Sequence, residues 1–373
     1  MRLLTIGHSY VVATNRRLAH EMAVQGKGRW EVTAVAPSKL AGDLRDVALE
    51  PMPDEASALR ALEVKIGAIP HLRFYRHLRP VLDSAWDVVH IWEEPYVLAG
   101  AQIAAAAPAR ARVVPATFQN IVKRYPWPFR YMERRVMRRA NGWIAFGHTV
   151  HEALSTRTEY TSRPSRVISP GVDVDRMYPD PSARMEVRRG LGWTNEAPIV
   201  GYLGRFVPEK GLTTLMHALE AVKAPWNALF VGGGPMEEDL KEFAASRPDR
   251  VRVLTDVNHE QVPQHLNAMD LLCAPSETTS RWREQFGRML VEAMACGVPV
   301  IASRSGEIPH VLDDAGLLVE ERNVPQWTAA IEQLLDDAKQ RRDLAARGLT
   351  RVHDRFALPV VARAHLTFFE ELL

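Results

Sequence analysis

Short apolar runs recur along the first half of the chain, and each one is followed by a polar or glycine-containing loop. Runs of this length, bounded by turn signals, predict buried strands. They cover residues 3–6, 30–36, 86–91, 112–116, 143–146 and 166–169. Helical patterns lie between them, the clearest at residues 15–25. Strands that alternate with helices predict a parallel, doubly wound α/β sheet.

The second half of the chain repeats this alternation. Its predicted strands cover residues 199–203, 226–231, 251–254, 271–274 and 298–302, and its last residues, 356–373, form one long helical pattern. A chain of 373 residues is also too long for one ordinary core. The pattern therefore predicts two doubly wound domains.

One segment of the second half, residues 284–303, combines a glycine loop, a helix and a buried strand. Gly287 precedes a run of good helix formers that starts at Arg288, and Gly297 ends that run. A helix that begins on a glycine loop offers free backbone N–H groups and the positive end of its dipole, which suits a phosphate.

Two carboxylates flank the start of this predicted helix, Glu284 before it and Glu292 one turn inside it. The side chains around them are apolar or small, so burying either carboxylate without a partner is costly. Adjacent sugar hydroxyls are good partners for an ionised carboxylate. We interpret one carboxylate as a ligand of a sugar ring and the other as a ligand of a ribose. The alternative is a solvated surface helix that happens to carry Glu.

Composition narrows the class of protein. The net charge is +2, so no global nucleic-acid signature is present. The two cysteines, Cys273 and Cys296, lie in apolar surroundings and indicate buried thiols in a reducing compartment. No zinc-ligand spacing, membrane-length apolar run or signal-peptide pattern occurs, so we expect a soluble cytoplasmic protein with no metal site.

The segment 284–303 closely resembles the signature of retaining glycosyltransferases of family 4. Its residues run Glu284, Gln285, Phe286, Gly287, then Glu292, then Ala-Met-Ala-Cys-Gly at 293–297 and an apolar strand. Only Gln285 departs from the commoner Gly. The resemblance implies the GT-B fold, in which two Rossmann-like domains face each other across a cleft. It places an acceptor domain at residues 1–170, completed by the C-terminal helix 356–373, and a nucleotide-sugar donor domain at 171–355.

The resemblance also implies roles for individual residues of the donor domain. Arg205 and Lys210 match the pair that clamps the donor diphosphate, and Glu284 would orient the donor sugar. The chemistry of the leaving group supports the assignment of Arg205 and Lys210. A diphosphate leaving group needs cations, and without a metal the protein must supply them. The predicted donor-binding residues are Gly204, Gln285, Phe286, Gly287, Arg288, Met289 and Glu292.

The acceptor domain offers candidates in the loops after its predicted strands, where ligands of such sheets bind. His8 and Ser9 follow the first strand, and the amides Gln119 and Asn120 suit sugar hydroxyls. Glu93 and Glu94 follow another strand and are equally well explained as hydroxyl ligands or as loop and cap residues.

Two departures from the family pattern affect the acceptor side. Many relatives open their first helix with Gly-Gly, where this chain has Ala13 and Thr14. Many carry His where this chain has Gln119. A lost imidazole removes one candidate proton carrier.

Residues 121–139 are strongly basic and contain aromatic residues. Seven cations, Lys123, Arg124, Arg130, Arg134, Arg135, Arg138 and Arg139, face a single acid, Glu133. The segment suits contact with the anionic inner face of a membrane, where each added cation contributes about 1 kcal/mol. It equally suits an anionic acceptor, or a solvated helix whose arginine stems cover apolar surface.

The resulting hypothesis is a metal-independent retaining glycosyltransferase that moves a hexose from a nucleotide-diphosphate sugar, UDP- or GDP-linked, to a hydroxyl acceptor. The acceptor would be a glycan, a glycolipid or a small molecule, and no cofactor or nucleic acid is expected. The alternatives are a sugar-nucleotide epimerase of the same fold and a catalytically weak binding subunit. A glycoside hydrolase pair is disfavoured because Glu292 lies on a helix beside a phosphate-type loop.

Overall fold

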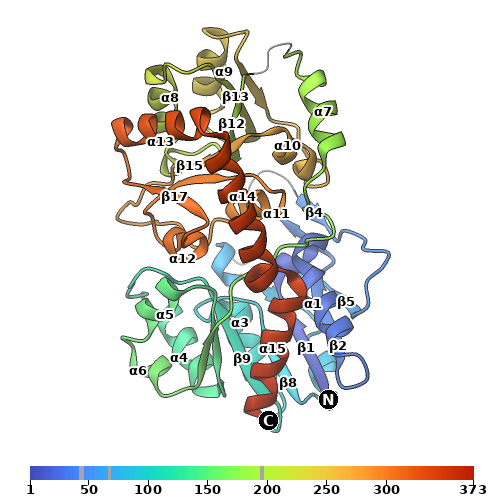
Figure 1. Ribbon diagram of the computed structural model, residues 1–373. Coiled ribbons are helices and arrows are strands. Elements are labelled where there is room, and N and C mark those ends of the chain that lie inside the picture. The colour runs from blue at the N-terminus through green and yellow to red at the C-terminus, as the bar shows by residue number, and fades with distance from the viewer. Residues whose placement is uncertain (42–45, 66–68, 194–196) are drawn as a thin grey trace. The chain divides into compact units, whose positions relative to one another are not determined.

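The computed structural model of the chain describes residues 1–41, 46–65, 69–193 and 197–373, and these residues form two units (Figure 1). Unit 1 comprises Met1–Gly171 and Leu358–Leu373, and unit 2 comprises Val172–Ala357. Each unit contains one parallel sheet with helices on both faces, which confirms the predicted doubly wound architecture.

The sheet of unit 1 has seven parallel strands in the order β11-β10-β9-β8-β1-β2-β5. Along the chain they are β1 (Arg2–Ile6), β2 (Glu31–Pro37), β5 (Ala58–Leu62), β8 (Val88–Ile91), β9 (Arg112–Thr117), β10 (Trp143–Ala145) and β11 (Ser165–Val167). Two small antiparallel pairs lie outside it, β3 (Lys39–Ala41) with β4 (Asp46–Ala48) and β6 (Val64–Lys65) with β7 (Phe74–Tyr75).

Helices bury both faces of this sheet. Its helices are α1 (Ala13–Gln25), α2 (Arg79–Leu82), α3 (Leu98–Ala106), α4 (Phe129–Arg139), α5 (His148–Leu154), α6 (Thr158–Thr161) and α15 (Leu358–Leu372), with the 3-10 turns η1 (His8–Val11) and η2 (Pro70–Leu72). Side chains of successive strand residues point to opposite faces. Leu3 therefore packs with α1 and α15, and Leu4 packs with α3 and α4. Burial on both faces explains why the strands appear as continuous apolar runs.

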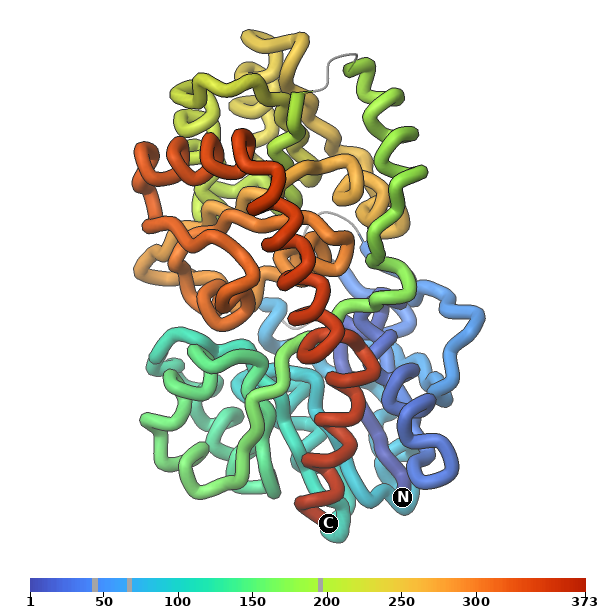
Figure 2. Tube along the Cα trace, viewed as in Figure 1, coloured from blue at the N-terminus to red at the C-terminus, as the bar shows by residue number. Residues whose placement is uncertain are grey.

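The C-terminal helix belongs to unit 1, as Figure 2 shows by placing the red end of the chain beside the blue start. The Trp30 indole N–H donates a hydrogen bond to Glu370 Oε1 at 2.9 Å. The helix begins at Leu358 and not at the predicted residue 356. Ala357 is extended because it forms a β-bridge with Val172, so residues 352–356 end the preceding helix as a separate π-helical turn, η4 (Val352–Phe356).

The sheet of unit 2 has six parallel strands in the order β14-β13-β12-β15-β16-β17. They are β12 (Ile199–Arg205), β13 (Asn227–Gly233), β14 (Val251–Leu254), β15 (Leu271–Ala274), β16 (Val300–Ser303) and β17 (Gly316–Val319). The helices are α7 (Pro181–Gly190), α8 (Leu212–Ala221), α9 (Glu237–Ala245), α10 (Val262–Ala268), α11 (Arg288–Ala295), α12 (Ile308–Leu312), α13 (Val324–Asp336) and α14 (Ala338–Arg351), with the 3-10 turn η3 (Pro208–Lys210).

Two strands of the sheets, β5 and β17, were missed by the apolar pattern. Four of the five residues of β5 are exposed at the sheet edge, so the strand has no buried apolar run. Three of the four residues of β17, also an edge strand, are only partly buried. Edge strands carry a weaker hydrophobic signal because one of their sides faces solvent.

The strand order places one switch point in each unit. In unit 1 the chain continues from β1 to β2 on one side and returns to β8 on the other side of β1. In unit 2 it continues from β12 to β13 and β14, then returns to β15 on the other side of β12. Ligands of open α/β sheets bind at such points, beyond the carboxyl ends of the strands. Among the residues described, no helix has both the length and the apolar character that a membrane span requires.

Candidate functional site

The loops that follow β12 and β15 meet at the switch point of unit 2. Lys210 ends η3, and Gly211 is the N-cap residue of α8, with a left-handed φ of 69°. A Cβ atom on Gly211 would lie 1.9 Å from the carbonyl oxygen of Pro275, so only glycine allows the two loops to approach this closely. The contact brings Lys210 to the carboxyl end of β15.

Glu284 reaches the same point from the loop before α11. Gly306 packs against its backbone, because a Cβ atom on Gly306, whose φ is 52°, would lie 2.0 Å from the Glu284 carbonyl oxygen. The Glu307 N–H donates to that oxygen at 3.0 Å. Two loops far apart in the sequence thus position one carboxylate.

Lys210 and Glu284 form a buried ion pair at the centre of the site. The Lys210 ammonium donates to Glu284 Oε2 at 2.5 Å, and the Ser276 hydroxyl donates to the same oxygen at 2.8 Å. The Trp282 ring lies over the ammonium, with Nζ 5.0 Å from the ring centroid. A lysine ammonium has three N–H donors and the carboxylate pair uses one. Lys210 therefore keeps donors for an anionic ligand while it still holds Glu284.

Arg205, the other residue of the predicted clamp, lies at the end of β12 and is largely exposed. Its guanidinium approaches Glu209 at 4.0 Å, and the Tyr202 hydroxyl donates to its carbonyl oxygen at 2.8 Å. The sheet therefore places Arg205 and Lys210 in one loop, but only Lys210 is part of the buried ion pair.

At the start of α11, a ligand would meet mainly backbone groups and few side chains. Gly287 precedes the helix in the left-handed conformation, and no side chain caps its N-terminus. The Phe286 ring packs against Phe356 with ring centroids 5.9 Å apart, and Met289 is buried in the same core. Of the predicted donor-binding residues in this loop, only Gln285 and Arg288 have exposed side chains. Phe286 and Met289 can therefore serve a ligand only through their amides.

Glu292 lies one turn into α11 on its less buried side. Burial raises the pKa of its carboxyl group, and the positive charges of Arg288 and Arg176 oppose that rise. A carboxylate that gains hydrogen bonds from ligand hydroxyls would recover the lost stabilisation of its charged form. Gly204, also predicted to contact the donor, lies in β12 next to Arg205.

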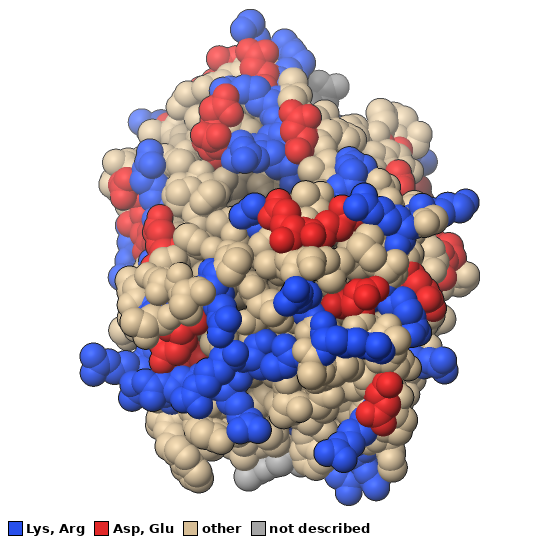
Figure 3. Space-filling model, turned by 90° about the horizontal axis from the view of Figure 1, so that it is seen from below, with Lys and Arg blue, Asp and Glu red and all other residues tan. Residues whose placement is uncertain are grey.

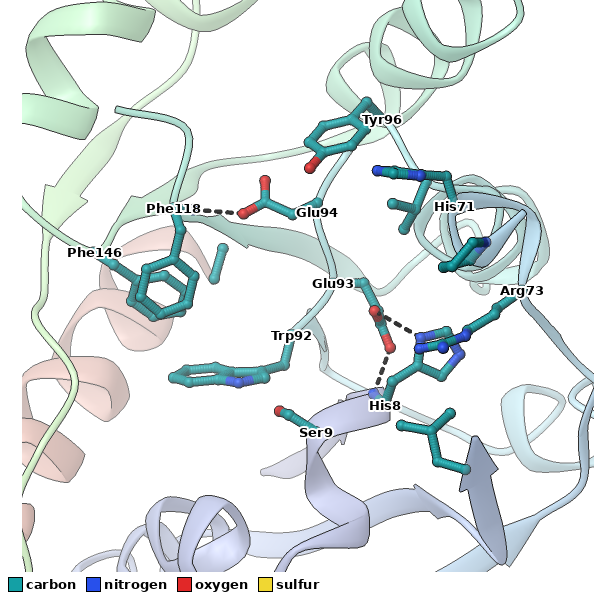
Figure 4. Close-up of a pocket in the computed structure, with 14 residues that line it drawn as sticks. His8, Ser9, His71, Arg73, Trp92, Glu93, Glu94, Tyr96, Phe118 and Phe146 are labelled. Atoms are coloured by element: carbon teal, nitrogen blue, oxygen red, sulfur yellow. Dashed lines mark hydrogen bonds and ion pairs between the residues drawn. The ribbon is translucent and has the colours of Figure 1, made fainter. Parts of the chain in front are cut away.

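Unit 1 has a cavity of about 410 Å³ at its own switch point, between the ends of β1 and β8 (Figure 4). His8 follows β1, and its backbone N–H donates to Glu93 Oε1 at 2.5 Å while its Nδ1 lies 3.1 Å from Glu93 Oε2. The Trp92, Phe118 and Phe146 rings line one side of the cavity, and His71, Arg73 and Tyr96 line another (Figure 4).

Several buried polar atoms around this cavity have no hydrogen-bond partner among the described residues. Three of them belong to cavity-lining side chains, His8 Nε2, Ser9 Oγ and Arg73 Nε. Buried polar groups are normally satisfied, so a cluster of unsatisfied ones at a cavity indicates a site for a polar ligand. The structure thus brings the predicted His8 and Ser9 together with Arg73, which carried no motif in the sequence.

Glu94 also lines the cavity and is the anchor of the next loop. The Thr117 hydroxyl donates to Glu94 Oε2 at 2.6 Å, and the Phe118 N–H donates to Oε1 at 2.7 Å. Burial raises the pKa of Glu94 to about 7, although these two bonds and one from Gln119 oppose the rise. Glu94 therefore changes charge near neutral pH.

Gln119 and Asn120 are both buried in unit 1. The Gln119 amide donates to Glu133 Oε1 at 3.3 Å, and its own Oε1 has no partner among the described residues. Glu133 also accepts from Arg157 at 2.7 Å and from the Tyr160 hydroxyl at 2.9 Å. Sequence reasoning missed this network. Its only signal was that Glu133 is the sole acid within a run of cations.

The chain departs from the family's Gly-Gly pattern at Ala13 and Thr14, at the start of α1, and this difference has a structural consequence. The Ala13 N–H, where many relatives have the first glycine, donates to Glu50 Oε2 at 2.8 Å. This helix start is therefore occupied by a carboxylate of the chain itself. Among the residues described, no three His, Cys, Asp or Glu side chains gather in a way that could hold a metal ion.

Two family models match the chain and together cover most of it. Residues 11–176 match the model described as "Glycosyltransferase Family 4", and residues 183–351 match "Glycosyl transferases group 1". These matches confirm the family resemblance drawn from residues 284–303.

Several curated relatives are named as mannosyltransferases. The chain is 36% identical over 209 residues to a GDP-mannose-dependent alpha-(1-6)-phosphatidylinositol monomannoside mannosyltransferase of Mycolicibacterium smegmatis, covering 52% of this chain and 54% of that protein. It is 31% identical over 252 residues to a lipopolysaccharide core biosynthesis mannosyltransferase of Rhizobium meliloti, covering 63% of this chain and 70% of that protein. The chain spans about half the length of the first curated relatives that it matches.

Solved structures share the fold at low sequence identity. A glycosyltransferase from Rickettsia africae superposes with a TM-score of 0.77 at 17% identity, covering 100% of this chain and 98% of that one. This likeness concerns the fold alone and confirms the GT-B architecture.

Proposed function

We propose that this chain, which belongs to glycosyltransferase family 4, transfers a hexose from a nucleoside diphosphate sugar to a hydroxyl group of an acceptor. The observation that carries the proposal is the buried Lys210–Glu284 ion pair at the switch point of unit 2. A buried cation held beside a carboxylate suits a ligand that joins a phosphate to a sugar.

Lys210 would neutralise the diphosphate as the bond to the sugar breaks. Negative charge grows on the leaving group in that step, and a preorganised ammonium stabilises it without reorganisation of solvent. Arg205 and the amides at the start of α11 would supply further charge stabilisation, which leads us to propose a reaction without a metal. Glu284 would hold the donor sugar through hydroxyl hydrogen bonds.

Retention of the anomeric configuration is part of the proposal through the family pattern at residues 284–303. The acceptor hydroxyl would attack on the face that the diphosphate leaves, and the leaving phosphate would take its proton. No side chain of unit 2 then needs to act as a general base.

Glu292 would accept hydrogen bonds from the ribose hydroxyls of the nucleotide. Burial disfavours its charged form, and two hydroxyl donors favour it again. Nucleotide binding should therefore lower the pKa of the Glu292 carboxyl group and release a proton at pH values where the free protein still holds one. Calorimetric titration in buffers of different ionisation enthalpy measures this proton release, and Glu292→Gln should abolish it.

The acceptor would bind in the cavity of unit 1. The His8, Ser9 and Arg73 atoms that lack a partner among the described residues offer hydrogen bonds to a polar ligand. The aromatic side of the cavity offers a flat apolar surface to a sugar ring. The buried amides Gln119 and Asn120 lie in the loop next to this cavity and would add hydroxyl contacts. A glycolipid acceptor would bring the protein to a membrane, and residues 121–139 are the segment that suits such contact.

The test is calorimetric binding of GDP, UDP, ADP and dTDP, followed by acceptor-dependent release of the preferred nucleotide. GDP-mannose is the first donor to test, because the curated relative from Mycolicibacterium smegmatis is GDP-mannose-dependent. Glu292→Gln should weaken nucleotide affinity about tenfold to a hundredfold, the value of a charged hydrogen bond. Glu284→Gln should mainly slow transfer.

The matched control is Glu186→Gln, which changes an exposed carboxylate on α7 and should leave nucleotide affinity unaltered. Binding of none of the four nucleotides would overturn the proposal in favour of a binding subunit without donor chemistry. Turnover of the nucleotide sugar without an acceptor, giving an isomeric sugar, would identify an epimerase.

A further inference from the structure

We propose that unit 1 docks on an anionic lipid bilayer through one surface, which presents its acceptor cavity to a membrane-held acceptor. We call it the α4 surface. It consists of exposed residues of α4 and of the segment before it, namely Val122, Lys123, Arg124, Trp127, Arg130, Tyr131, Arg135 and Arg138. The docking itself does not depend on the proposed reaction, whereas the role of the cavity rests on it.

Large apolar side chains on the α4 surface project into solvent. Trp127 is 82% exposed, Val122 is 63% exposed and Tyr131 is 52% exposed. A tryptophan ring that is mostly exposed to water contributes little stabilisation through burial. Trp and Tyr side chains are favoured at the headgroup level of a bilayer. The inner side of α4 is fixed in the core by Val136 and Met137, so the outer side is held outward.

The charge of the same surface is strongly positive. Arg124, Arg130, Arg135 and Arg138 form none of the ion pairs found among the described residues. Glu133, the one acid of the segment, is buried and already bonded to Arg157. Figure 3 shows a band of Lys and Arg side chains on the side where α4 and α6 lie in Figure 1, with few acidic side chains inside it.

The combination of features favours a lipid partner over a nucleic acid. Cations alone would suit either polyanion. A nucleic acid offers no apolar layer for Val122, whereas the boundary between headgroups and acyl chains accommodates both an aliphatic side chain and the Trp127 ring.

The α4 surface is directly connected to the wall of the acceptor cavity. Tyr125 stacks on the cavity-lining Tyr96 with ring centroids 4.2 Å apart. Phe129, the first residue of α4, meets the cavity-lining His71 edge to face at 5.7 Å. Because the same short segment carries the docking residues on one side and the cavity contacts on the other, docking would place the cavity near the headgroups.

The test is flotation of the full chain with vesicles of phosphatidylcholine alone and of phosphatidylcholine mixed with phosphatidylglycerol. We expect binding only to the anionic vesicles, and weaker binding as salt rises, because salt screens exposed charges. The triple variant Arg124→Gln, Arg130→Gln, Arg135→Gln should lose on the order of 100-fold in affinity, from about 1 kcal/mol per cation. Trp127→Ser should lose roughly tenfold through its apolar area.

Matched controls carry the same substitutions elsewhere. Arg189→Gln, Arg342→Gln and Arg355→Gln remove three exposed arginines of unit 2, and Met185→Ser removes a side chain that is 62% exposed. Both controls should float like the unaltered chain. Brominated lipids should quench the tryptophan fluorescence of the chain more than that of Trp127→Phe, because only Trp127 would enter the bilayer.

Equal flotation with neutral and anionic vesicles, or α4-surface variants that float like the controls, would overturn the proposal. Binding of polyuridylate RNA without binding of vesicles would overturn it too. Calorimetry with nucleotides on the same preparations separates the two proposals. Flotation without nucleotide binding would support the docking surface and refute the proposed transferase. Nucleotide binding without flotation would support the transferase and refute the docking surface.

Discussion

Lys210→Met is expected to destabilise unit 2 strongly, because it removes the ammonium and leaves the Glu284 carboxylate in its buried position. Residues Lys210 and Glu284 are 8% and 6% exposed, and their charged atoms lie 2.5 Å apart. Removing one partner of a buried pair costs about 3–5 kcal/mol. At about 2–4 °C per kcal/mol for a domain of this size, the midpoint of thermal unfolding should fall by roughly 10 °C.

The coupling between the two groups can be measured with a double-mutant cycle in urea-induced unfolding. Glu284→Gln removes the charge but keeps an acceptor for the Ser276 hydroxyl. The combined variant Lys210→Met, Glu284→Gln should therefore be more stable than the sum of the single losses predicts, by about 2 kcal/mol. Lys241→Met, which breaks only solvent-exposed pairs with Glu237 and Glu238, is the matched control and should leave the midpoint unchanged.

The reasoning would be refuted if Lys210→Met unfolded at the same temperature as Lys241→Met, or if the two single losses added without coupling. Either result would mean that Glu284 is not held by Lys210 in the folded chain. The same variant should also lose nucleotide affinity in calorimetry, since the ammonium is the proposed diphosphate ligand.

Three further perturbations follow from the structure. Burial raises the pKa of Glu94 from 4.5 to about 7, so between those values the folded chain keeps a proton that the unfolded chain releases, and stability falls as pH rises. Between about pH 5 and pH 8, the free energy of unfolding measured in urea should fall by about 3 kcal/mol less for Glu94→Gln than for the unaltered chain. An equal fall in the two proteins would contradict the raised pKa. Gly306→Ala, with its Cβ against the Glu284 carbonyl, should lower the melting temperature and slow transfer, whereas Gly190→Ala, where a Cβ meets open space, should do neither. Asp270 is partly buried, which opposes ionisation, yet Arg188 and Arg184 hold its pKa below the usual value. Asp270→Asn should cost about 2 kcal/mol at neutral pH, and a loss equal to that of an exposed Asp would refute the pairing.

Much of the strand pattern could be predicted because the central strands are buried on both faces. The run at residues 251–254 coincides with β14, and the run at 271–274 coincides with β15. The prediction missed strands with a weak apolar pattern, such as the exposed edge strand β5. The C-terminal helix was predicted to begin at residue 356 and not at Leu358, because the β-bridge between Val172 and Ala357 joins residues far apart in the chain.

The candidate sites were only partly predictable. His8 and Ser9 followed from their place after a strand, Glu284 from its place before the glycine-loop helix, and Lys210 from the family resemblance. The hydrogen bonds of Glu133 were not predicted, because the many cations of residues 121–139 suggested a solvated helix. In the fold, this one acid points inward to Gln119 and Arg157. A charge pattern along a sequence does not reveal which face of a helix is buried.

The sequence by itself determined the alternation of strands and helices, the family pattern at residues 284–303 and the chemical types available for a site, because apolar periodicity and glycine loops are local properties. Only the tertiary structure decided which groups meet. The order of strands creates the two switch points, and the close approaches at Gly211 and Gly306 bring Lys210 to Glu284 across 74 residues of chain. Those contacts depend on packing between distant segments, and no local pattern specifies them.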